Sequence, residues 1–160
     1  MNFAFMKSSF VTEAKSLEAS LTTIQQQFGF REINKSLDAL GVTIVVQNAS
    51  TGVRCLFSPR EGEGWMVKVV RLRDGQFPKY PIFIKPNTVL DWFDIIDVAR
   101  LRIQAIPELN EIIERNLPLN AEAVVTILEK CCSDILNGNF RLFEHLDSTV
   151  KTRAVQLRQP

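Results

Sequence analysis

The stretch VTIVVQNASTGVRCLF, residues 42–57, decides the fold of this chain. In each half, every second residue is apolar, as expected of a half-buried β-strand. These apolar positions are Val42, Ile44 and Val46 in the first half, and Val53, Cys55 and Phe57 in the second. The segment between the halves, residues 48–52, is rich in turn-forming residues. The stretch therefore predicts a β-hairpin.

A third strand follows the hairpin. Residues 59–64 form a polar turn, and in residues 65–70 (WMVKVV) Trp65, Val67 and Val69 share one face. Strands joined by short links favour an antiparallel meander. Prolines restrict the next segment, so residues 82–84 are predicted as a short fourth strand at an edge. The expected sheet has three to four antiparallel strands over about residues 42–84.

Two helices are predicted before this sheet. Apolar residues spaced four and three apart form one helical stripe that ends near Gly29. The stripe consists of Phe10, Ala14, Leu17, Leu21, Ile24 and Phe28. A shorter helix is predicted to follow before Gly41, from the similar spacing of Phe30, Ile33, Leu37 and Leu40.

Three to four helices are predicted after the sheet. The first is expected to be capped by Thr88 and to end near Gln104, and a short one starts at Pro107. A longer helix runs from the cap Asn120 to the stop at residues 137–138, and Leu142, Leu146 and Val150 indicate a last one. Helices, sheet and helices in succession predict one α+β domain over residues 1–160. Its ends, residues 1–7 and about 155–160, are expected to fray.

Composition limits the classes of function. There are 19 Lys and Arg against 18 Asp and Glu, a net charge of +1, so the positive field that nucleic acids require is missing. The sequence has no leader pattern and no apolar run of about 20 residues. We therefore expect a cytoplasmic protein with no nucleic acid and no membrane as partner. Three cysteines, two of them adjacent, indicate reduced thiols.

No catalytic or metal-binding constellation stands out in the sequence. His145 is the only histidine, and its neighbour Glu144 does not face it across a helix. Cys55, Cys131 and Cys132 lack the pairwise spacing of a zinc site. The sequence thus predicts no metal, no cofactor and no catalytic residue. This favours a non-enzymatic protein without excluding an enzyme.

Two charged sets are candidate binding residues. Asp91, Asp94 and Asp97 recur every third residue in the helix expected after Thr88, where they form an acidic stripe that suits a basic partner. The alternative is that they serve the helix dipole and an Asp97 to Arg100 pair. As an alternative site, three cations of the third strand and its extension could bind an anion, or could pair with neighbouring strands. They are Lys68, Arg71 and Arg73.

The outward-facing strand positions are also partly apolar, and they require cover. These positions are Val45, Leu56, Met66 and Val70. Helices packed on this second face would be one cover. The alternative is an exposed patch that binds a partner or a second copy of the chain.

Residues 71–81 (RLRDGQFPKYP) and 135–140 (ILNGNF) resemble small uncharacterised bacterial proteins, some of them similar to immunity proteins of polymorphic toxin systems. The resemblance implies a protein-binding role, with a toxin domain as partner, and it transfers no catalytic residue. The expected function is therefore that of a non-enzymatic protein-binding protein that neutralises a toxin. The alternatives are a homo-oligomeric structural protein, or a small ligand-binding protein or enzyme with a cleft lined by Arg and Asp.

Overall fold

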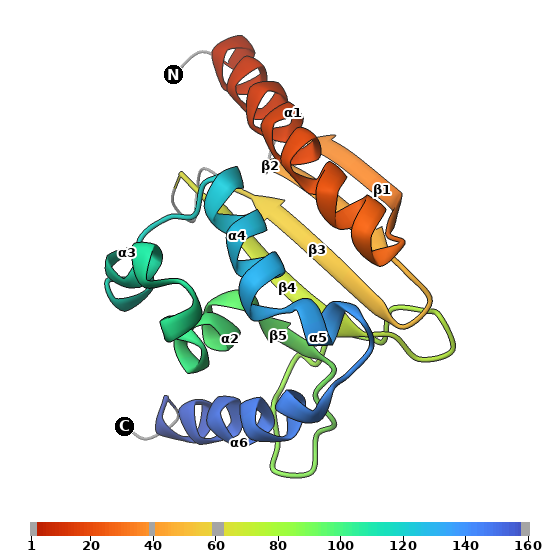
Figure 1. Ribbon diagram of the computed structural model, residues 1–160, viewed down its shortest axis with the longest axis vertical. Coiled ribbons are helices and arrows are strands. Elements are labelled where there is room, and N and C mark those ends of the chain that lie inside the picture. The colour runs from red at the N-terminus through yellow and green to blue at the C-terminus, as the bar shows by residue number, and fades with distance from the viewer. Residues whose placement is uncertain (1–2, 39–40, 59–62, 158–160) are drawn as a thin grey trace.

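The computed structural model describes residues 3–38, 41–58 and 63–157. Within these ranges the chain is an α+β structure with a five-stranded antiparallel sheet and six α-helices (Figure 1). The strands lie side by side in chain order, each next to its predecessor. They are β1 (Arg31–Asp38), β2 (Gly41–Gln47), β3 (Thr51–Phe57), β4 (Trp65–Arg71) and β5 (Trp92–Asp94). The predicted fold class is confirmed, with one or two strands more than expected.

The predicted hairpin and third strand are confirmed as β2, β3 and β4. In the register of these strands Val46 lies opposite Val53, and Val53 lies opposite Val69. Directly opposed side chains share a face, so the alternating apolar residues of the three strands form one continuous layer. This layer is the floor of the core, and its residues are buried.

Helix α1 (Phe3–Phe28) lies across this layer over β1 and β2 (Figure 1). Its predicted stripe is confirmed, because five of the six stripe residues are buried in the core and Phe28 packs against it. The helix ends where predicted: Gly29 has a φ of +68°, a left-handed conformation that glycine adopts without strain.

The second predicted helix is wrong, since residues 31–38 form strand β1. A spacing of four, as between Ile33 and Leu37, is a multiple of the strand period of two and therefore fits both structures. Hydrogen bonding to β2 along the length of β1 decides in favour of the strand. Both side chains are exposed rather than buried on a helical stripe. Leu40, the last residue of that pattern, lies outside the described residues.

The segment after β4 also differs from the prediction. Residues 82–84 form no strand, and β5 pairs with β4 in their place. Helix α2 (Ile95–Leu101) begins seven residues after Thr88, and its cap is Asp94, whose Oδ1 accepts the backbone N–H of Ile96 at 2.9 Å. Thr88 instead accepts the backbone N–H of Lys85 and closes a turn. The capping-box spacing was thus a coincidence of two short polar residues.

The remaining helices follow the predicted order, except that one predicted helix is split in two. Two 3₁₀ turns (Ile103–Ala105 and Pro107–Leu109) lead into α3 (Asn110–Glu114). The predicted cap Asn120 is confirmed, because its side chain accepts the backbone N–H of Ala123. The predicted long helix is split at Cys132 into α4 and α5, and the last helix is α6. These three span Ala121–Cys131, Ser133–Leu136 and Arg141–Gln156.

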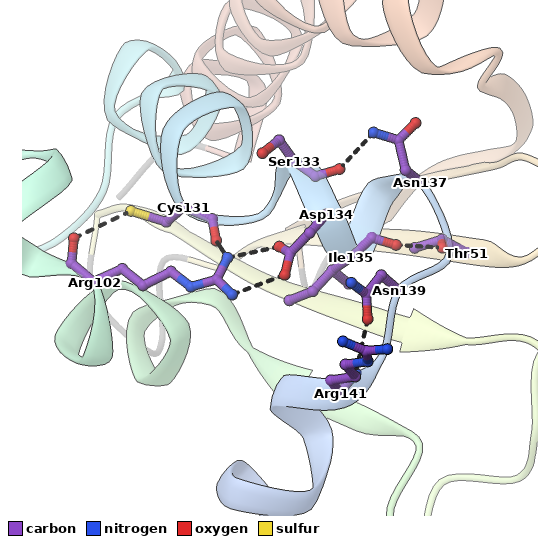
Figure 2. A network of polar contacts seen from close by, with 9 residues as sticks. All are labelled: Thr51, Arg102, Cys131, Ser133, Asp134, Ile135, Asn137, Asn139 and Arg141. Carbon is purple, nitrogen blue, oxygen red and sulfur yellow. Dashed lines mark hydrogen bonds and ion pairs between the residues drawn. The ribbon is translucent and has the colours of Figure 1, made fainter.

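Arg102, at the end of α2, is hydrogen-bonded to the junction between α4 and α5 (Figure 2). Its guanidinium donates to the Cys131 carbonyl at 2.6 Å and to both carboxylate oxygens of Asp134 at 2.6 and 2.8 Å. This hydrogen bonding lowers the pKa of the Asp134 carboxyl. On the other side of the junction, the Thr51 hydroxyl donates to the Ile135 carbonyl at 2.8 Å. The junction is therefore held from α2 and from β3.

We expect Asp134→Asn to lower the free energy of unfolding by about 1 to 2 kcal/mol near neutral pH, because the charge-assisted bidentate pair is lost. A depressed folded-state pKa contributes stability above the ordinary carboxyl pKa, and this contribution disappears as pH falls through the folded value. The difference between parent and variant should therefore shrink below about pH 4. Urea unfolding at several pH values measures it, and a difference independent of pH would contradict the assignment.

Asn48 is a polar hub that joins the β2–β3 turn to the ends of α1 and α5. The Asn48 amide, in the β2–β3 turn, donates to the carbonyls of Phe28 at 3.0 Å and Leu136 at 2.8 Å. Its side-chain oxygen accepts the backbone N–H groups of Ser50 and Thr51. One asparagine thus fixes its own turn and connects it to the last turns of α1 and α5.

All of this helical packing is on one face of the sheet. Helices α1 and α4 lie in front of the strands in Figure 1, and α6 reaches the same layer through Phe143, whose ring is 4.5 Å from that of Phe93.

Across the described ranges, no helix is long and apolar enough to cross a membrane.

Candidate functional site

The three candidate aspartates lie on three different elements. Asp91 precedes β5, Asp94 ends it, and Asp97 belongs to α2. Because the helix begins only at Ile95, the expected acidic stripe on one helix is wrong. A role of these residues in partner binding stays a prediction, and their surroundings bear on it.

Asp91 is buried and bound to two of the candidate cations. Arg71 donates to its carboxylate at 2.7 Å, and Arg73 donates at 2.8 and 3.0 Å. The hydrogen bond to Asp91 raises the pKa of Arg73. The alternative reading, in which the strand cations pair with neighbours, describes both arginines. One nitrogen of Arg71 and two of Arg73 thus donate to an internal carboxylate.

Asp97 is also buried and connects two helices. Its carboxylate accepts from Arg100 at 3.2 Å, which confirms the predicted pair, and from Arg153 of α6 at 2.8 Å. Asp94 differs, since a third of its side chain is exposed and Lys68 Nζ is 4.0 Å from Oδ2. Burial raises the pKa of the Asp94 carboxyl, against the opposing effect of its bond to the Ile96 N–H. Of the three, only Asp94 is accessible to a partner.

The other candidate groups occupy positions without a site around them. His145 is exposed on α6. The three cysteines are free and buried, and burial raises the pKa of the Cys55 thiol to about 12. Within residues 3–38, 41–58 and 63–157, no group of three or more His, Cys, Asp or Glu side chains is placed to hold a metal ion.

In the described structure a loop covers one end of the second face of the sheet. The ring of Phe77 lies over Gly52, where a Cβ would be 2.3 Å from it, and its centre is 5.5 Å from that of the Trp92 ring, in a tilted contact. The Trp92 indole N–H donates to the Pro78 carbonyl at 3.0 Å. This segment buries Val70. Of the two alternatives for this face, helical cover is not found in the described part of the chain.

Beside this loop the second face is hollowed. The hollow has a volume of about 310 Å³. It is lined by Arg54, Leu56, Met66, Lys68 and Tyr80. Leu56 and Met66, from opposed positions of β3 and β4, are only half-buried and form an apolar floor. Two of the four outward apolar residues noted in the sequence therefore line an open concave surface, which we call the sheet hollow.

Two cations stand directly opposite each other in the sheet hollow. Arg54 of β3 is paired in register with Lys68 of β4. The Lys68 ammonium lies 5.6 Å from the centre of the Tyr80 ring. Arg54 forms no hydrogen bond or ion pair with any residue that the structure describes. Sequence reasoning missed Arg54, although the hairpin register would have placed it beside Lys68.

An apolar loop continues from Tyr80 beyond the sheet hollow. Ile82 and Phe83 are 78% and 70% exposed, and Lys79 and Lys85 flank them as exposed cations. Adjacent bulky apolar side chains with so much exposed surface are typical of a contact region. The sequence placed these residues in a strand, where one of the two would have been covered.

Comparison with known proteins adds no assignment to this geometry: no protein-family model matches the chain, and neither curated proteins nor solved structures give a match.

Proposed function

We propose that this chain is a non-enzymatic protein-binding protein whose contact surface is the sheet hollow together with the adjoining residues Tyr80, Ile82 and Phe83. One observation carries the proposal. An apolar floor and two facing cations, Arg54 and Lys68, lie on a sheet face that helices leave open in the described structure. Exposed aromatic and apolar groups beside arginine are the composition enriched in protein interfaces.

Charge specifies the partner. Within the described structure, the ion pair that involves either of the facing cations is that of Lys68 with Asp94, at 4.0 Å. A partner with acidic side chains beside apolar ones would complement this surface, and complementary charge raises the association rate and specificity. The resemblance to immunity proteins makes an acidic toxin domain the first partner to test. In that case the chain would neutralise the toxin by covering it.

A homo-oligomer is the second candidate, favoured by the free edge of β1. Among the strands that the structure describes, β1 pairs with β2 alone, and nearly all its side chains are exposed. However, the strand carries four charged residues, and such charges commonly prevent pairing between edge strands. They are Arg31, Glu32, Lys35 and Asp38. We therefore rank a second copy below a different protein.

The test begins with a photoreactive residue at Ile82 and, as a control, at the exposed Glu122 of α4. A protein cross-linked from Ile82 only is then purified and titrated against the parent and the double variant Arg54→Glu with Lys68→Glu. We expect the double variant to bind at least about tenfold more weakly, because each reversal opposes an acidic partner.

The matched control reverses two exposed lysines of the helical side, Lys15→Glu with Lys130→Glu, and should bind like the parent. Equal binding by parent and Arg54/Lys68 variant would overturn the proposal. Cross-links from Ile82 to the chain itself would support the homo-oligomer instead.

A further inference from the structure

We infer that the sheet hollow is an anchor pocket for a carboxylate carried beside an apolar or aromatic group, as in an acidic side chain on the surface of a protein partner. This inference rests on the proposed function and names the chemical group that the surface receives. It follows from the charges, the floor and the wall of the hollow.

The charges call for an anion. Like charges directly opposite each other on neighbouring strands are destabilising, and Arg54 faces Lys68 in this way. The nearest carboxylate oxygen to Lys68, on Asp94, is 4.0 Å away, and the other oxygen of Asp94 accepts the Ile96 N–H. Asp94 therefore matches Lys68 only partly and leaves Arg54 without a partner in the described structure. A carboxylate between the two cations would remove their repulsion.

The same protein shows what such a site looks like when filled. At Asp91, two arginines surround one carboxylate with three hydrogen bonds of 2.7 to 3.0 Å. Arginine presents a planar fork of donors that fits a carboxylate, and lysine adds a point charge. Arg54 and Lys68 offer one guanidinium and one ammonium group, and in the described structure Asp94, 4.0 Å from Lys68, forms no bond to Arg54. The acceptor for this pair would come from outside the chain.

The floor and wall select what carries the carboxylate. Leu56 and Met66 offer apolar surface, and methionine adapts its shape to what it contacts. Tyr80 forms a wall of the hollow and is held in place, because its ring packs edge-on against Trp92 at 5.6 Å between ring centres. The Trp92 indole N–H in turn donates to the Pro78 carbonyl. A volume of about 310 Å³ is at the small end for ligand sites. It suits one or two side chains, not a nucleotide.

The test uses a small carboxylic acid, so that it does not depend on a partner. Protein with labelled Leu and Met methyl groups is titrated with 3-phenylpropionate and, separately, with the neutral 3-phenylpropan-1-ol at equal ionic strength. We expect the Leu56 and Met66 methyl resonances to shift to saturation with the acid. The alcohol should bind at least about tenfold more weakly, which corresponds to about 1.4 kcal/mol.

Variants separate the charge from the floor. Arg54→Gln and Lys68→Gln should reduce binding of the acid to that of the alcohol, whereas Lys15→Gln, on α1, should leave it unchanged. Equal binding of acid and alcohol, or unchanged binding of the acid to both Gln variants, would overturn the inference. Displacement of the acid by inorganic phosphate at equal concentration would also overturn it, since the pocket would then recognise charge alone.

The two proposals fail in different ways. If 3-phenylpropionate binds as expected but the cross-linked partner ignores Arg54→Glu with Lys68→Glu, the proposed function fails while the pocket chemistry stands. If the partner responds to these reversals but the acid does not bind, the contact surface stands and the carboxylate anchor fails.

Discussion

Leu17→Ala and Leu21→Ala are each expected to lower the free energy of unfolding by about 2 to 5 kcal/mol. Both side chains lie on the buried stripe of α1, with 0% and 1% of their surface exposed. The stripe packs against the sheet and α4. Solvent therefore cannot fill the space that either truncation leaves. Removing three carbon atoms costs the lost burial and leaves a cavity in a close-packed interior.

The matched control is Val11→Ala, on the same helix but 38% exposed. It should change the free energy of unfolding by no more than about 0.5 kcal/mol. Urea denaturation of the three variants measures the difference. Unfolding midpoints for Leu17→Ala and Leu21→Ala that equal the parent's would show that α1 does not pack on the sheet.

Asn48→Ala is expected to destabilise the protein by about 2 to 4 kcal/mol. The substitution removes five side-chain hydrogen bonds, the longest of them at 3.5 Å from the Ser50 hydroxyl, and leaves the carbonyls of Phe28 and Leu136 without this partner in a partly buried place. An unsatisfied buried polar group costs about 1 to 3 kcal/mol. The loss of stability should affect α1, α5 and the β2–β3 turn together, since the asparagine joins all three.

Asn137→Ala is the control for this prediction. Its amide donates only to the Ser133 carbonyl within the same helical turn, and the group is exposed. We expect a change of about 0.5 kcal/mol or less in thermal or urea unfolding. If the two asparagine variants were equally stable, the hub at Asn48 would have no energetic role.

Much of the fold could be predicted because its signals are local and long. The stripe of α1 covers five turns up to Gly29, and apolar residues at every second position identified β2, β3 and β4. Residues 31–38 were assigned incorrectly because only pairing with β2 makes them a strand. Local periodicity cannot report a hydrogen-bonded neighbour that comes later in the chain.

The candidate site was harder to predict, for the same reason. Asp91 was expected on an exposed helical stripe, but Arg71 and Arg73 enclose it from the end of another strand. The outward apolar positions left two alternatives open, and in the structure Leu56 and Met66 are half-buried. Sequence alone could not say that a loop covers Val70 and stops at Tyr80, because loop paths depend on tertiary contacts such as that of Phe77 with Trp92.

The chain-order sheet has a consequence for how the protein forms during synthesis. Strands β1 to β4 each pair with their neighbour in sequence, and contacts between nearby residues form fast. The stripe of α1, however, is closed by α4, which starts about a hundred residues after the stripe at Ala121. A ribosome-bound fragment that ends near Arg71 should therefore contain a paired sheet but expose the part of the α1 stripe that α4 contacts. We expect such fragments to bind a hydrophobic dye until residues up to about 136 have emerged, when α4 and α5 can close the core.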